Sequence, residues 1–223
     1  MMNFDLIIFD CDGVLIDSEI LSNRAEVELL KSFGIEFNLG DYMAQFVGKS
    51  TKDVLKTIEV SHNVSLPPEF RRLAETQIFT AFKTELQPIP GIFELISSLN
   101  TAKCIASSSS LSRLEITLNI TGLFDKFSPH IFSAEQVIRG KPAPDLFLFA
   151  AAKMQVSPDR CVVIEDSPYG VRAGVHAGMT VLGFTGGSHI QPGHEARLRD
   201  EGAIEICSDM SQVSDWLNRH PLA

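Results

Sequence analysis

The chain has 223 residues, of which 44% are hydrophobic, so it can bury a sizeable core as one domain or as one domain plus a smaller one. Its net charge is −9 without a basic cluster, which argues against nucleic acid or an anionic membrane surface as the main partner. No stretch is long and apolar enough to cross a bilayer, and no signal peptide is recognised, so we expect a cytoplasmic protein, by default a monomer.

The first predicted element is a strand over residues 6–9, LIIF, which runs directly into two acids, Asp10 and Asp12, followed by Gly13. Carboxylates this close repel one another, and each loses hydration when a site closes around it. A buried strand with this ending therefore predicts a site in which something offsets the repulsion. Cys11 lies between the two acids, and we read it, like the other cysteines, as a buried free thiol, because no metal-binding spacing is present.

Residues 17–87 break the pattern of strands, because their apolar residues recur at helical spacing. Prolines and a glycine at residues 88–91 then mark the return to the sheet. We therefore predict a helical module over residues 17–87, inserted between two parts of an α/β core, residues 1–16 and 88–223. The helical stripes run over residues 20–33, 54–58 and 70–82.

After residue 88, short apolar runs alternate with segments that carry helix-start signals. This alternation favours an open parallel sheet with right-handed crossovers. The predicted strands are residues 103–107, 161–165 and 180–184, with weaker candidates at 130–134 and 204–208. The predicted helix starts are Ser110, Pro144, Pro168 and Ser211.

Polar side chains follow several of these strands at the point where each strand ends. Because the carboxyl ends of parallel strands meet at one edge of an open sheet, we expect them to lie together. Three or four carboxylates together need a cation, and oxygen ligands select Mg²⁺, whose open positions take a phosphate oxygen. The set comprises Asp10, Asp12, Ser107, Lys141 within GKPAPD, Glu165 and Asp166.

Four motifs resemble those of the haloacid dehalogenase superfamily: DCDGVLIDSE, the strand-end Ser107, GKPAPD with Lys141, and VVIEDSPYG. The resemblance is to the phosphatase and β-phosphoglucomutase-like branch, among which the chain looks most like sugar-phosphate and sugar-acid phosphate phosphatases. It implies a Rossmann-like parallel sheet with helices on both faces and an inserted α-helical cap domain. The substrate it implies is a small-molecule phosphate ester.

The resemblance also implies a role for each acid. Asp10 is the nucleophile that forms an aspartyl phosphate, and Asp12 is the general acid that protonates the leaving alcohol and later the base that activates water. Magnesium is held by the Asp10 carboxylate, the Asp12 backbone carbonyl and Asp166, with Glu165 binding directly or through water.

Phosphate contacts follow from the same resemblance. Ser107 donates to a phosphoryl oxygen, the backbone near Ser108 completes the cradle, and Lys141 offsets the charge on the phosphate and on Asp10. Ser107 is preferred to Ser108 within the SSSS run because it directly follows the apolar residues of the strand. Asp17 is interpreted as a helix cap or structural acid rather than a catalytic group.

Substrate choice in this superfamily comes from the cap, where the candidates are Ser18, Glu19 and Ser22 on the first helix and Gly48 and Lys49 in the loop VGKS. The alternative for that loop is a solvated turn that only caps the next helix. β-Phosphoglucomutases carry a cap histidine and a basic clamp for a second phosphate, which we do not find at the matching positions. This difference favours a phosphatase over a phosphomutase.

The glycine-rich segment 183–198 contains His189 and His194. We expect these to be surface-loop histidines, the alternative being that one of them reaches substrate.

The function predicted is Mg²⁺-dependent hydrolysis of a sugar or sugar-acid phosphate through an aspartyl phosphate, with a β-phosphoglucomutase-type mutase as the alternative. A haloalkanoic acid dehalogenase would lack the second aspartate and the metal, and a phosphonatase would need a cap lysine. A non-catalytic phosphoryl-binding module would have lost one of the key acids or the lysine, all of which are present.

Overall fold

The computed structural model describes residues 4–46 and 51–220. The chain divides into two compact units. Unit 1 comprises Met1–Asp17 and Gln87–Ala223, and unit 2 comprises Ser18–Leu86. Within the described ranges, no helix combines the length and the apolar composition needed to span a bilayer.

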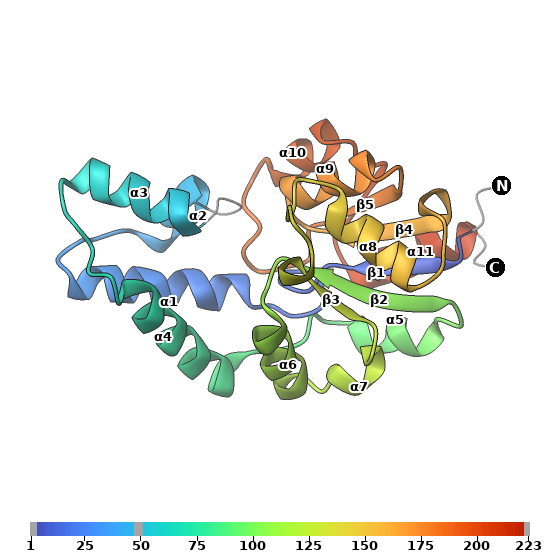
Figure 1. Cartoon of the computed structure of the whole chain (residues 1–223), viewed down its shortest axis with the longest axis horizontal. Helices are drawn as coiled ribbons and strands as arrows, with labels where there is room; N and C mark the ends of the chain where they lie inside the picture. Colours follow the sequence, from blue (N-terminus) through green and yellow to red (C-terminus); the bar gives the residue numbers. More distant parts are fainter. Residues whose placement is uncertain (1–3, 47–50, 221–223) are drawn as a thin grey trace. The chain divides into compact units, whose positions relative to one another are not determined.

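Unit 1 is built on a six-stranded parallel sheet in the order β3-β2-β1-β4-β5-β6. Helices α8 and α9 lie on one side of this sheet and α5, α6 and α7 on the other (Figure 1). The predicted α/β class with helices on both faces is therefore confirmed. The strands are β1 (Leu6–Phe9), β2 (Ala102–Ser107), β3 (Ile131–Ser133), β4 (Cys161–Glu165), β5 (Thr180–Phe184) and β6 (Glu205–Cys207).

Central strand β1 explains why the apolar runs fold as they do. All four of its residues are buried, and it pairs in parallel with β2 on one side and β4 on the other. A strand covered on both faces reads as a continuous apolar run, which is what the sequence shows at 6–9 and 161–165. Residues of β1, β2 and β4 pack with α8 and α9 into one core.

The helices of unit 1 begin close to the predicted starts. Ser110 caps α6 by accepting a hydrogen bond from the Arg113 N–H, and Pro144 and Pro168 stand at the starts of α8 and α9. One start differs: α11 begins at Met210, not Ser211, because the Asp209 carboxylate caps the Gln212 N–H at 2.9 Å. The helices are α5 (Ile92–Ser98), α6 (Leu111–Ile120), α7 (Phe124–Phe127), α8 (Asp145–Lys153), α9 (Pro168–His176), α10 (His194–Asp200) and α11 (Met210–Arg219).

Unit 2 is helical throughout its described elements and has its own core of leucine, isoleucine and aromatic side chains. Helices α1 and α4 pack along one another (Figure 1), and an ion pair of 2.6 Å joins Arg24 to Glu85. Helix α2 was missed in the sequence although Asn38 caps its start by accepting the Gly40 N–H at 2.8 Å, because the helix is only eight residues long. The helices are α1 (Glu19–Ser32), α2 (Leu39–Phe46), α3 (Thr51–His62) and α4 (Phe70–Glu85).

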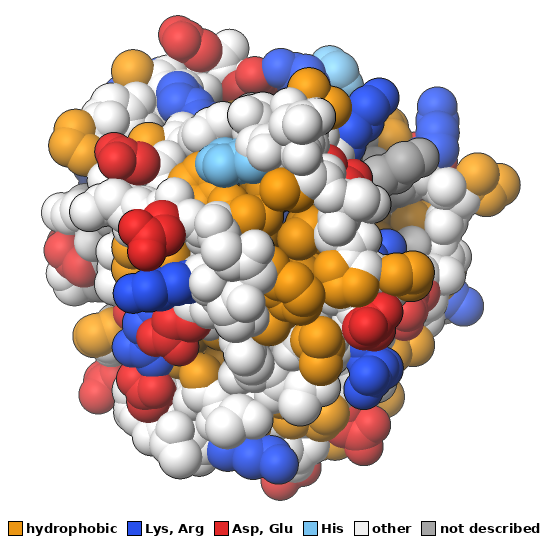
Figure 2. Space-filling view, turned by 90° about the vertical axis from the view of Figure 1, so that its left-hand side faces the viewer, with side chains coloured by type: hydrophobic (Ala, Val, Ile, Leu, Met, Phe, Trp, Pro, Cys, Tyr) orange, Lys and Arg blue, Asp and Glu red, His pale blue; other side chains and the backbone are white. Residues whose placement is uncertain are grey.

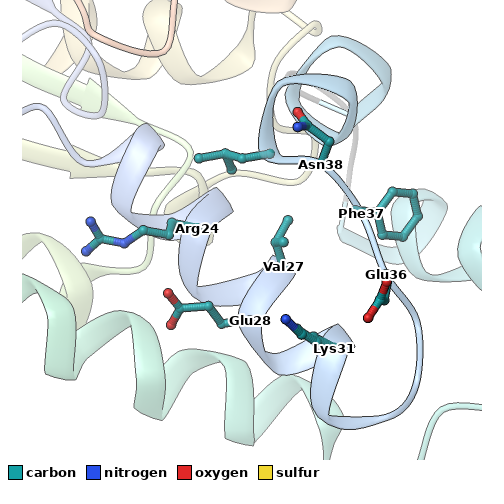
Figure 3. A pocket seen from close by; sticks show the side chains of 8 residues that line it. Arg24, Val27, Glu28, Lys31, Glu36, Phe37 and Asn38 are labelled. Atoms are coloured by element: carbon teal, nitrogen blue, oxygen red, sulfur yellow. The ribbon is translucent and has the colours of Figure 1, made fainter.

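The surface of unit 2 carries two further features. Figure 2 shows hydrophobic side chains gathered on one face of the molecule, and among the described residues of unit 2 the exposed large apolar ones are Phe33, Val60 and Val64. A pocket of about 390 Å³ lies between α1 and the segment 36–39 (Figure 3). Its lining mixes cations and acids, such as Lys31 and Glu28, and contains none of the predicted site residues.

The described cysteines agree with the sequence prediction. All four are free and buried. Burial, with the neighbouring Asp12 and Asp10 carboxylates, raises the pKa of the Cys11 thiol well above its usual range. A thiol held protonated in this way is a poor nucleophile, so Cys11 packs as a small apolar residue between the two acids.

Candidate active site

The ends of three adjacent strands bring the predicted residues of unit 1 together. Phe9 in β1 is level with Ile105 in β2 and Ile164 in β4, so all three strands end at one edge of the sheet. The Asp10 N–H extends the ladder by donating to the Ile164 carbonyl at 3.0 Å. The side chains that follow these strands therefore lie at one edge of the sheet, as expected for an open parallel sheet.

Lys141 joins two of the acids. Its Nζ donates to Asp10 Oδ1 at 2.6 Å and to Glu165 Oε1 at 3.3 Å, and its side chain is only 4% exposed. Burial alone would lower the pKa of Lys141, but the Asp10 and Glu165 carboxylates outweigh it and hold the pKa above its usual value. The lysine is therefore a fixed positive charge at the centre of the site.

Asp10, Glu165 and Asp166 form an acidic cluster in which one oxygen from each residue lies within 4.8 Å of the others. Burial, with the Glu165 carboxylate next, raises the pKa of Asp10 well above its usual value although Lys141 opposes this. The pKa of Glu165 is also raised, chiefly by burial. One ammonium cannot balance three buried carboxylates, so the cluster fits a divalent cation with oxygen ligands.

Gly13 lets the chain turn beside this cluster. Its φ is +82°, and a Cβ placed there would lie 2.0 Å from Asp166 Oδ2. Both the backbone conformation and the contact exclude a side chain at this position. The glycine of the first motif is thus explained by the close approach of the Asp166 carboxylate.

Asp12 has two partners that the sequence did not reveal. The Ser109 hydroxyl donates to Asp12 Oδ2 at 2.6 Å, and Arg113 Nη2 lies 3.3 Å from Asp12 Oδ1. Ser109 is one of four consecutive serines, and Arg113 is an ordinary first-turn residue of α6, so no local signal marked either one. Only the adjacency of β1 and β2 brings them to Asp12.

Ser107 is the last residue of β2 and is buried, whereas Ser108 is exposed. The Ser107 hydroxyl accepts the Ser109 N–H at 3.1 Å, and Ser133 Oγ donates to the Ser109 carbonyl at 2.7 Å. The turn after β2 is therefore held from both sides. The phosphate-binding roles of Ser107 and Ser108 stay predictions.

The expectation that His189 and His194 are surface residues is wrong. Both are buried, at 2% and 5% exposure. His189 Nε2 lies 3.0 Å from Asp166 Oδ2, and His194 Nε2 lies 2.5 Å from the Asp166 carbonyl oxygen. No local pattern predicts this contact, because the histidines follow β5 whereas Asp166 follows β4.

Asp17 lies at the end of the first segment of unit 1. Its Oδ1 accepts hydrogen bonds from the Ser188 N–H at 3.1 Å and from the Ser188 hydroxyl at 2.9 Å. These bonds fit the interpretation of Asp17 as a structural acid, because they fix the segment that leads into His189.

The predicted substrate contacts of unit 2 cluster at the start of α1. Ser22 Oγ donates to the Ser18 carbonyl at 3.0 Å, and Asn23 Nδ2 donates to the Glu19 carbonyl at 2.6 Å. The roles of Ser18, Glu19 and Ser22 toward substrate stay predictions. Gly48 and Lys49 lie outside the described residues.

Comparison with known proteins identifies the family to which the chain belongs. Residues 4–178 match the family model of the haloacid dehalogenase-like hydrolases. The chain belongs to this family. A curated relative, 6-phosphogluconate phosphatase of Escherichia coli K12, is 28% identical over 86% of this chain and 87% of its own length. Hexitol phosphatase A of the same strain is 33% identical over 78% of this chain and 80% of its own.

Among solved structures, a haloacid dehalogenase-like protein of unknown function from Agrobacterium tumefaciens, ATU0790, is 40% identical. It superposes with a TM-score of 0.90 over 97% of this chain and 99% of that one. With curated phosphatases among its relatives, the chain is a phosphoric monoester hydrolase of the haloacid dehalogenase-like family.

Proposed function

We propose that this hydrolase releases phosphate from a small sugar or sugar-acid phosphate through an aspartyl phosphate on Asp10, with Mg²⁺ as its cofactor. The observation that carries the proposal is the buried cluster of Asp10, Glu165 and Asp166, bridged by Lys141. A carboxylate so placed is a nucleophile with a cation beside it, at the edge of the sheet where a phosphate can enter.

In the first step, a carboxylate oxygen of Asp10 attacks phosphorus while the bond from phosphorus to the ester oxygen breaks. Asp12 gives its proton to the departing oxygen, which leaves as an alcohol. Lys141 and the Ser107 hydroxyl face the negative charge on the phosphoryl oxygens. Loss of one such donor typically raises the barrier by about 2.7–4 kcal/mol.

In the second step, Asp12, now a carboxylate, takes a proton from water. The water oxygen attacks phosphorus and the bond to Asp10 breaks, which releases inorganic phosphate and restores both acids. Ser109 and Arg113 hold the Asp12 side chain, so they fix the direction in which it can exchange protons.

Asp10 and Asp166 would hold the metal through carboxylate oxygens, with Glu165 beside them and the Asp12 carbonyl as a further ligand. When bound there, Mg²⁺ supplies positive charge that polarises the phosphoryl group. That unit 2 acts as the cap that selects the leaving group is part of the same proposal.

The test of the function is phosphate release from a panel of sugar, sugar-acid, polyol and nucleotide monophosphates, with Mg²⁺ and with EDTA. We expect Mg²⁺-dependent release from one or a few sugar or sugar-acid phosphates. Release only from nucleotides would contradict the proposed substrate class. Without release from any ester, conversion of β-glucose 1-phosphate in the presence of a bisphosphate primer would identify a mutase instead.

Ser109→Ala tests the proton-transfer role of Asp12. The variant loses the 2.6 Å bond that orients Asp12, so kcat/KM for an alkyl phosphate should fall by about two- to tenfold, as expected from a neutral hydrogen bond of roughly 0.5–1.5 kcal/mol. For p-nitrophenyl phosphate kcat/KM should change little, because nitrophenolate leaves without protonation. Ser112→Ala removes a nearby hydroxyl bonded to Ser110 and serves as the control. Equal losses on both esters would contradict the role given to Asp12.

A further inference from the structure

Two buried histidines from one segment approach the same aspartate. His189 and His194 follow β5, and both contact Asp166, which follows β4. A backbone carbonyl only accepts hydrogen bonds, so His194 must donate its Nε2–H to the Asp166 carbonyl. His189 Nε2 lies 3.0 Å from Asp166 Oδ2.

The packing around His189 leaves its ring little freedom. A Cβ at Gly187 would lie 2.8 Å from the His189 ring and 3.1 Å from the Gly13 carbonyl oxygen. A Cβ at Gly13 would lie 2.8 Å from His189 Cε1. Two glycine positions thus make room for the imidazole against the Asp166 carboxylate. The preceding residue, Ser188, donates two hydrogen bonds to the Asp17 carboxylate.

We propose that His189 is a positioning residue of the metal site, a role that rests on the proposed metal-dependent function. Its Nε2 faces Asp166 Oδ2 at 3.0 Å and fixes the rotation of the carboxylate, so that Oδ1 is the oxygen presented to the metal. His194 holds the backbone of the same residue. A ligand carboxylate whose orientation is already fixed in the metal-free protein loses less side-chain conformational entropy when the metal binds.

A histidine that merely filled the core would affect stability and leave metal affinity unchanged, which makes metal affinity the deciding measurement. Partners that orient a metal ligand typically change metal affinity by about 10–100-fold when they are removed. Mn²⁺ serves as the probe, because the resonance of the free ion reports binding directly and requires no substrate or turnover.

The experiment titrates Mn²⁺ into the full chain, free of phosphate, and compares four proteins by electron paramagnetic resonance. His189→Leu removes the donor, and His189→Gln returns an N–H near the position of Nε2. His220→Leu is the matched control. His220 also contacts a backbone carbonyl, because its Nδ1 lies 2.8 Å from the carbonyl oxygen of Trp216 in α11. We expect His189→Leu to bind Mn²⁺ at least tenfold more weakly than wild type, His189→Gln to recover most of the loss, and His220→Leu to match wild type.

A folded His189→Leu protein whose Mn²⁺ affinity stays within twofold of wild type would overturn the role of His189 and leave the proposed function standing. Equal weakening in His220→Leu would overturn it too, because the loss would then be general. Wild type that binds no Mn²⁺ would overturn both proposals. Should His189→Leu fail to fold, Gly187→Ala decides: its methyl displaces the ring, so at least fivefold weaker binding supports the role and unchanged binding overturns it.

Discussion

Asp10→Asn is expected to reduce phosphate release by at least about 10⁴-fold, the scale of loss when a catalytic nucleophile is removed. The amide keeps the shape of the side chain and can still accept from Lys141, which lies 2.6 Å from Asp10 Oδ1. It does not attack phosphorus, and it is a weaker metal ligand than a carboxylate. The fold should survive, because the substitution removes a negative charge from beside Glu165 and Asp166.

The measurement is initial-rate phosphate release, together with acid quenching after mixing with radiolabelled substrate. Wild type should retain label on the protein, and Asp10→Asn should retain none. Asp145→Asn is the matched control, since that carboxylate is paired with Arg139 at 2.9 Å on the surface of unit 1 and should be dispensable. Full activity in a folded Asp10→Asn protein would refute the covalent mechanism.

The core of unit 1 could be predicted from sequence because its strands are covered on both faces. A continuous apolar run such as 161–165 or 180–184 then coincides with the strand itself. Short helices gave weaker signals: α2 and α5 were missed, and α5 begins at a glycine that offers no capping side chain. Such helices depend on tertiary packing more than on local sequence.

The candidate site was predictable where its residues end a strand, because one rule of topology brings strand ends together. Asp10, Ser107 and Asp166 followed from this rule. Ser109 and His189 did not, since their contacts depend on how the turns after β2 and β5 fold back over the edge of the sheet. The sequence shows that a loop histidine exists, but burial against a carboxylate arises only from packing.

The charged contacts of the site were also predicted only in part. Lys141 was predicted to offset the charge of the phosphate and of Asp10, and the structure shows that it contacts Glu165 as well. A single ammonium is therefore shared between two carboxylates while Asp166 is held by His189. With all three carboxylates ionised, the cluster would have an excess of negative charge, and the cost of burying this excess is the physical reason to expect that the reaction depends on a cation.

Removal of divalent metal should therefore nearly abolish turnover. With EDTA, phosphate release is expected to fall by at least about 10³-fold, because a metal at a phosphoryl group supplies several kcal/mol of charge stabilisation. Excess Mg²⁺ should restore the rate, whereas NaCl of equal ionic strength should not, since a diffuse monovalent ion does not bridge the carboxylates and the phosphate. The measurement is the initial rate as a function of free Mg²⁺.

Asp166→Asn tests whether the Mg²⁺ dependence comes from binding at the acidic cluster or from general screening of charge. The amide removes one negative charge from the cluster of Asp10, Glu165 and Asp166, so the Mg²⁺ concentration for half-maximal rate should rise by at least tenfold. Asp145→Asn should leave that concentration unchanged, because Asp145 lies outside the cluster. Hydrolysis that continues at full rate in EDTA would show that Lys141 alone balances the charge of the phosphate and the acids, and the metal role of Asp166 would then be wrong.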